Sequence, residues 1–200
     1  MHRSQVSCCA ITDDDALARE APTLLPFFVV EPDRSLERED VLMLLGAVSE
    51  RVSDVLAGFD AASLAYRHGP AFPTLGEILV HLAETSQRID TALRHAYLDK
   101  ADEIDVRACL DVPFDAASDE PTLELLHSYV RIRRRTVDLL RGVSPEDLDR
   151  QLHDAISGEL TLLDVCRLVV THELGHLTQI RSLVSLLPEP RDLGPLPSSA

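Results

Sequence analysis

Apolar side chains recur at intervals of three and four residues along four stretches of the chain, which is the spacing of one buried helix face. Proline and glycine bound these stretches: Pro73 precedes the second, Gly142 closes the third and Pro188 closes the fourth. Thr74 and Thr161 are suitable N-caps for the second and fourth. The pattern predicts helices over residues 36–59, 74–97, 121–142 and 161–187.

Residues 99–120 carry Asp, Pro and Ser with weak periodicity, and they are numerous enough to cross the full height of a helical bundle. The second and third helices are therefore expected to run parallel, and 144–147 is expected to form a short extra turn. The fold class predicted is all-α, a four-helix bundle with one long crossover.

The chain ends are expected to lie outside this bundle. Three prolines, Pro22, Pro26 and Pro32, exclude a helix from the apolar part of residues 1–35, so we expect an extended N-terminal arm. Residues 188–200 are rich in Pro and Ser and are expected to form a loose tail. The predicted domain is 36–187.

Composition narrows the classes of function. Apolar residues make up 45% and aromatic residues 4%, which favours a helical globular protein. A net charge of −15 disfavours nucleic acid and membrane surfaces as partners. Without a long apolar run before the acidic residues 13–15 we expect a cytoplasmic protein. The four cysteines show neither C-x-x-C spacing nor a dense framework and are expected to be reduced.

The fourth apolar stripe contains two histidines where Leu or Val is expected. His172 and His176 lie about 40° apart around the helix axis and about 6 Å along it, so they can bind one metal ion or form a hydrogen-bonded core pair. His81, at the core edge of the second helix, is the best third ligand, whereas His95 lies about 21 Å further along that helix. Metal affinity should fall below about pH 6.5, where free imidazole protonates.

The remaining histidines are expected to be solvated. They lie in the arm, in loops or near helix ends: His2, His68, His127 and His153.

Two other metal chemistries match parts of the sequence. His172-Glu-Leu-Gly-His176 fits the zinc-protease pattern, but no suitable downstream ligand follows and we expect Glu173 on the helix flank. The pairs Glu124/His127 and Glu173/His176 fit a di-iron carboxylate bundle, although their depths along the bundle disagree.

Two further groups invite a chemical role. Cys166 points away from the histidine face and is better explained as a small buried residue. Four arginines, Arg131 and 133–135, suggest a solvated, ion-paired helix face. Because 133 and 134 interrupt the apolar stripe, one guanidinium, that of Arg134 foremost, can alternatively reach an anionic substrate.

Three segments together resemble the DinB/YfiT-like metalloprotein superfamily. They are Thr74-Leu-Gly-Glu-Ile-Leu-Val-His81, Thr161-Leu-Leu-Asp-Val and His172-x-x-x-His176-x-x-Gln179-Ile180. Pro73 departs from this pattern, because many members have Trp there.

The resemblance implies a four-helix bundle that binds a divalent metal through His81, His172 and His176, with zinc or nickel favoured. It also implies a low-molecular-weight thiol as cosubstrate, S-transferase or isomerase chemistry on a small molecule, and a homodimer. Gln179 is the candidate for orienting a bound water or thiol, or else a plain polar flank. The alternatives are a metal-dependent hydrolase and a non-catalytic metal-binding or dimerisation module.

Overall fold

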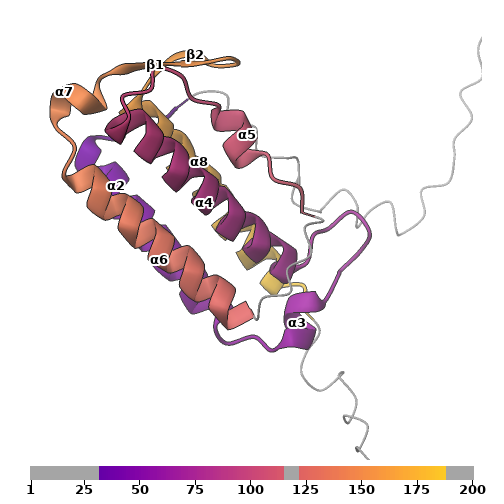
Figure 1. The fold of residues 1–200 in the computed structure, drawn as a ribbon. Coiled ribbons are helices and arrows are strands. Elements are labelled where there is room, and N and C mark those ends of the chain that lie inside the picture. The colour runs from indigo at the N-terminus through magenta and orange to yellow at the C-terminus, as the bar shows by residue number, and fades with distance from the viewer. Residues whose placement is uncertain (1–31, 115–121, 188–200) are drawn as a thin grey trace, which may run out of the picture.

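The computed structural model describes residues 32–114 and 122–187, and four long helices dominate it (Figure 1). The helices are α2 (Arg38–Leu56), α4 (Leu75–Leu98), α6 (Thr122–Arg141) and α8 (Leu162–Val184). The predicted four-helix bundle is therefore confirmed, with ends within about three residues of those expected, as is usual for helix boundaries. Thr74 and Thr161 each accept a hydrogen bond from the backbone N–H three residues on, so both act as N-caps.

Contacts between side chains give the direction of each helix. Asp90 of α4 accepts hydrogen bonds from Arg135 and Thr136 of α6, and further along both helices Tyr97 donates to the Gly142 carbonyl. Residue numbers rise together, so α4 and α6 are parallel, as the long connection predicted. By contrast, Arg38 at the start of α2 contacts the end of α6, so those two helices are antiparallel.

The crossover is more structured than its composition indicated. It contains α5 (Val106–Leu110), and between α6 and α8 lie α7 (Pro145–Leu148) and a hairpin of β1 (Gln151–Asp154) and β2 (Gly158–Thr161). The long connection thus contains a short helix, and neither α5 nor the hairpin was predicted from the sequence. A short α3 (Ala61–Ala65) lies between α2 and α4.

One buried carboxylate explains how these short elements hold together. Asp154 at the end of β1 accepts hydrogen bonds from the backbone N–H groups of Val106, Ile156 and Ser157. It therefore fixes the hairpin turn and the start of α5 at once. The contact with Val106 joins residues 48 apart in sequence, which local periodicity does not reveal.

The bundle interior contains two apolar clusters. One is built around Leu45, Ile89, Val137 and Val169, and the other around Leu56, Leu79, Leu126 and Ile180. Buried polar side chains from α4, α6 and α8 lie along the length of the helices between them, His81, Arg133 and His172 among these.

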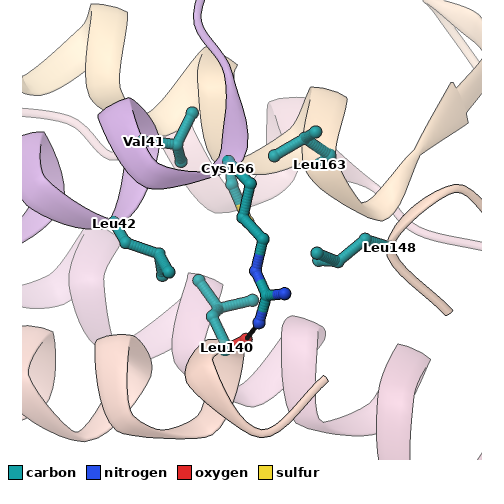
Figure 2. A pocket seen from close by; sticks show the side chains of 7 residues that line it. Val41, Leu42, Leu140, Leu148, Leu163 and Cys166 are labelled. Carbon is teal, nitrogen blue, oxygen red and sulfur yellow. Dashed lines mark hydrogen bonds between the residues drawn. The ribbon is translucent and has the colours of Figure 1, made fainter. Parts of the chain in front are cut away.

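Within the first cluster a small cavity of about 10 Å³ borders Val41, Leu140 and Cys166 (Figure 2). A space of that size holds at most one water molecule. Arg38 reaches past it and donates from Nη2 to the carbonyls of Leu140, Arg141 and Val143, which satisfies the C-terminal end of α6.

The predicted arm and tail fall almost wholly outside the described residues, which begin at 32 and end at 187. At the beginning of that range Arg34 pairs with Asp164, the residue that also closes the N-terminal cap of α8. Within the described part of the chain, no helix is long and apolar enough to cross a bilayer.

Candidate metal centre

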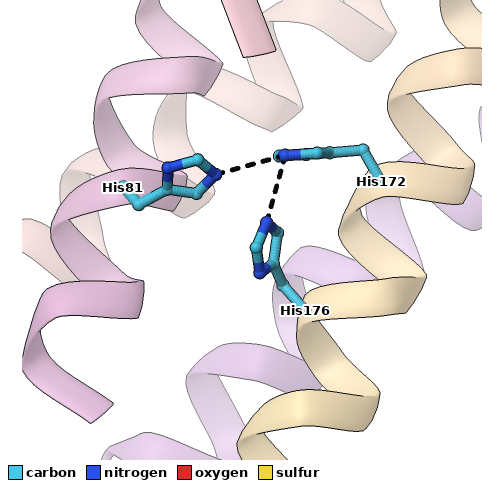
Figure 3. Close-up of side chains that lie close together, drawn as sticks. All are labelled: His81, His172 and His176. Carbon is cyan, nitrogen blue, oxygen red and sulfur yellow. Dashed lines mark hydrogen bonds between the residues drawn. The ribbon is translucent and has the colours of Figure 1, made fainter. Parts of the chain in front are cut away.

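Three buried histidines from two helices converge inside the bundle (Figure 3). His81 comes from the middle of α4, and His172 and His176 come from successive turns of α8. Each is less than 5% exposed. The Nε2 atom of His172 lies 3.1 Å from Nε2 of His81 and 3.1 Å from Nε2 of His176.

Hydrogen bonds on the far side of two rings decide which nitrogen carries the proton. Nδ1 of His81 lies 2.7 Å from the Val112 carbonyl, which can only accept, so Nδ1 carries the hydrogen. Nδ1 of His176 lies 2.9 Å from Oε1 of Gln179 and donates to it. Both Nε2 atoms therefore present lone pairs toward His172.

This arrangement fits a divalent cation better than it fits hydrogen bonding alone. His172 has a single Nε2 and can donate to only one of the two facing lone pairs. A tetrahedral ion with Zn–N bonds of about 2.0–2.1 Å holds its nitrogens about 3.3 Å apart, close to the separation seen here. Ligating histidines also typically donate their second N–H to a carbonyl or carboxylate, as His81 and His176 do.

Burial keeps these imidazoles neutral. Burial lowers the pKa of His172 well below its ordinary value, and nearby His176, His81 and Arg133 lower it further. Burial and, to a smaller extent, His81 lower the pKa of His176 to about 4. The pKa of His81 is also lowered by burial, against the opposing effect of the Val112 hydrogen bond. Neutral imidazole is the form that binds metal.

Glu173 is not the flank residue that the sequence suggested. Its side chain is fully buried, and Oε1 accepts a hydrogen bond of 2.5 Å from Nε of Arg133 on α6. Burial raises the pKa of Glu173, while Arg133 and the neighbouring Tyr129 hydroxyl lower it. A rotation of about 100° from His172 still faces the bundle interior here, where the side chain of Arg133 from α6 reaches across to Glu173.

The arginine cluster divides between interior and surface. Arg133 is fully buried, whereas Arg134, the residue preferred from the sequence for an anionic substrate, is exposed and pairs with Glu50 of α2. Arg135 pairs with the buried Asp90, and Arg131 is exposed. One guanidinium does enter the bundle, as considered from the sequence, but it is that of Arg133 and it contacts Glu173.

The remaining sequence candidates lie away from the centre. Among the described histidines outside it, His68, His95, His127 and His153 are all exposed. Glu124 is exposed as well, so its motif with His127 does not face Glu173 and His176 as a di-iron site requires. Cys166 is buried in an apolar cluster, and burial raises the pKa of its thiol to about 12, which confirms the structural interpretation.

Two residues that sequence reasoning missed, Val112 and Phe114, complete the surroundings of His81. Both follow α5 in the crossover, and the ring of Phe114 stacks on His81 with centroids 4.7 Å apart. The Val112 carbonyl carries no side-chain signal, and Phe114 follows a proline in a stretch without periodicity. Only the path of the crossover over α4 brings them to the site.

Comparison with known proteins gives the same picture of the fold. The family model for the DinB superfamily matches residues 44–180. A solved structure, YfiT from Bacillus subtilis, is similar with a TM-score of 0.63 and 16% identity, over 78% of this chain and 91% of that one. That protein is described as a probable metal-dependent hydrolase with an unusual four-helix bundle topology. No curated protein matches.

Proposed function

This chain belongs to the DinB superfamily, and we propose that it is a metal-dependent enzyme that transfers a small thiol to an electrophilic small molecule. The observation that carries the proposal is the convergence of the Nε2 atoms of His81, His172 and His176 in a buried site. Zinc and nickel both suit imidazole nitrogen.

The number of ligands favours catalysis over a structural role. Among the described residues, the only cluster with metal-ligand geometry consists of these three histidines. Structural zinc sites normally have four protein ligands, whereas catalytic sites have three and leave a position for water or substrate. When bound, the ion lowers the pKa of a thiol or water in that position, so that a nucleophile exists at neutral pH.

The chain's own residues prepare this position. Val112 and Gln179 hold His81 and His176 in the tautomer that exposes Nε2. Phe114 covers one face of His81 and approaches the edge of His176, with ring centroids 5.8 Å apart. Phe114 therefore keeps bulk water from that side of the imidazoles. The amide nitrogen of Gln179 can contact a ligand, because only the oxygen of that amide is bonded to His176.

The surroundings of Glu173 support a thiol rather than water as the nucleophile. In proteases with this histidine spacing the intervening glutamate removes the proton of the attacking water. Here Glu173 is fully buried in the bundle interior and bonded to Arg133, so it is not placed to act as that base. A thiol has an ordinary pKa of about 8.5 and needs no separate base once coordinated.

Activity measurements test the proposal. The zinc- or nickel-loaded protein is incubated with glutathione, bacillithiol or mycothiol and either a haloarene or an epoxide, and product is measured against metal-free protein and His176→Ala. We expect at least one thiol to raise product formation above both blanks. If no thiol does so, S-transfer is rejected.

Hydrolysis is the second candidate, supported by the similarity to a protein described as a probable metal-dependent hydrolase. A panel of esters and amides run with the same blanks measures it. Hydrolysis that requires the metal, without thiol transfer, would favour this function instead. No activity in either panel, from a protein that holds metal, would favour a binding module.

A further inference from the structure

A surface pocket of about 280 Å³ lies beside the three histidines, at the end of the bundle where α4 begins. It is lined by Arg67 and residues 70–73, which precede α4, by Glu77 of α4, and by Phe114 and Gln179. Ligand clefts for drug-sized molecules measure about 300–1,000 Å³, so this pocket suits a ligand with a single ring.

The pocket and the metal centre share two side chains. Phe114, which borders the pocket, also stacks on His81. Gln179, which borders it too, accepts a hydrogen bond from His176. A molecule in the pocket is therefore separated from the imidazoles by no more than these two side chains.

Four of the residues that line the pocket have flat apolar rings. They are Pro70, Phe72, Pro73 and Phe114. The edge of Phe72 is itself positioned by His68, whose ring meets it at 89° with centroids 5.3 Å apart. Stacking between flat apolar faces is the interaction such walls offer best.

The charges at the pocket are already paired. Arg67 is the cation among the described lining residues, and its guanidinium donates both to Glu77 and to the Phe72 carbonyl. Glu77 in turn accepts a hydrogen bond from the backbone N–H of Thr74 and caps α4. Binding a carboxylate at Arg67 would have to compete with that cap, so the pocket favours an uncharged ligand.

Gln179 provides one polar contact. Its Oε1 is occupied by His176, which leaves the Nε2 amide group as a donor. No described residue accepts a hydrogen bond from that group within the bundle. An oxygen on the ligand can fill this role, and the contact would direct that end of the ligand toward the histidines.

From these contacts we propose that this pocket binds the electrophilic substrate, and that the substrate is an uncharged single-ring compound whose carbonyl oxygen accepts a hydrogen bond from Gln179. This inference names the substrate class for the proposed thiol transfer and rests on that function. In the transfer a sulfur–carbon bond forms to the substrate, the bond from that carbon to a leaving group such as halide breaks, and the thiol proton passes to solvent.

Binding of 4-fluoroacetophenone to the full-length, zinc-loaded protein, followed by fluorine NMR, tests the pocket without turnover. We expect Phe72→Ala to weaken binding about tenfold, the scale of one lost aromatic contact. Phe59→Ala removes a ring that packs on the same core cluster but does not line the pocket, and should leave affinity unchanged. Equal effects of the two changes would overturn the assignment.

A second variant tests the pocket independently, in case Phe72→Ala does not fold. Ala71 is exposed and lines the pocket, so Ala71→Trp should fill it and abolish binding in a protein that unfolds at the wild-type temperature. Unchanged binding to a folded Ala71→Trp would reject the site.

Two related probes test the chemical class. Fluorobenzene, which lacks the oxygen, and 4-fluorobenzoate, which is anionic, should both bind at least tenfold more weakly than the ketone. Tighter binding of the benzoate would make this an anion site and overturn the proposal. The advantage of ketone over fluorobenzene should disappear in Gln179→Leu, and its persistence would remove Gln179 from the site.

Metal content, measured on each sample, separates this inference from the proposed function. If the protein binds no zinc or nickel, the proposed function fails, and the probe experiments still report on the pocket. If the protein binds metal and transfers thiols, but its affinity for 4-fluoroacetophenone is unchanged by Phe72→Ala and Ala71→Trp, only the inference about the pocket fails.

Discussion

Nε of Arg133 lies 2.5 Å from Oε1 of Glu173, and both side chains are fully buried between α6 and α8. Arg134, the next residue along α6, forms its ion pair with Glu50 at the surface, where both side chains are more than half exposed. Two adjacent arginines therefore each pair with a glutamate, one pair in the bundle interior and the other in solvent.

The two environments predict very different costs of mutation. Arg133→Met should lower the free energy of unfolding by about 3–5 kcal/mol, because it leaves Glu173 buried without its partner. Arg134→Met should change it by about 1 kcal/mol or less, since the pair is solvated. Urea denaturation measures both. The double change Arg133→Met with Glu173→Leu should recover much of the loss. Similar costs for the two single changes would contradict the buried arrangement.

Metal binding should depend on the three converging histidines and on no surface histidine. Protein purified without chelator is expected to hold about one zinc or nickel ion per chain. His172→Ala or His176→Ala should abolish binding, and His95→Ala should not, because His95 is exposed and pairs with Asp99. Elemental analysis and calorimetry measure these outcomes. Equal effects at positions 95 and 176 would exclude the three-histidine site.

Gln179 should support metal affinity although it is not itself expected to bind the ion. Gln179→Leu removes the acceptor that orients Nδ1–H of His176 and should weaken metal binding about 10–100-fold. Gln87→Leu, on the exposed face of α4, is the matched control and should have no effect. Competition with a coloured zinc chelator provides the affinities. An unchanged affinity in Gln179→Leu would show that the hydrogen bond does not hold the ligand.

Protonation of the buried histidines should lower the stability of the metal-free protein at acid pH. The pKa of His176 is lowered to about 4, whereas an unfolded histidine titrates near 6.5, so between these values the unfolded chain binds more protons. Stability should therefore be fully present above about pH 6.5 and fall by about 1.4 kcal/mol per pH unit for each such histidine below it.

Urea denaturation of metal-free protein at pH 7 and pH 5 measures this loss. His176→Leu should reduce the pH dependence, and His95→Ala should leave it unchanged. The same burial also revises the expectation from sequence that metal affinity falls near pH 6.5, since the folded imidazoles stay neutral to lower pH. Metal release at that pH from a protein that remains folded would contradict the lowered pKa values.

The sequence alone predicted the four long helices and the two histidines of α8. Both follow from local rules: a buried helix face requires apolar residues every three or four positions, and the helix itself fixes the spacing of His172 and His176. The length of the crossover was enough to predict parallel α4 and α6. His81 followed from its place on the apolar edge of α4, supported by the family resemblance.

What surrounds those histidines depends on how the helices pack. The burial of Glu173 depends on the packing of the whole bundle, which lets Arg133 of α6 reach it across the interior. The apolar stripe of α6 is interrupted at 133 and 134, so periodicity alone does not tell which of these two arginines points inward. Val112 and Phe114 reach His81 because Asp154 of the hairpin holds the start of α5. These contacts join segments distant in sequence, and their energy comes from burial and hydrogen bonding that exist only once the helices have packed.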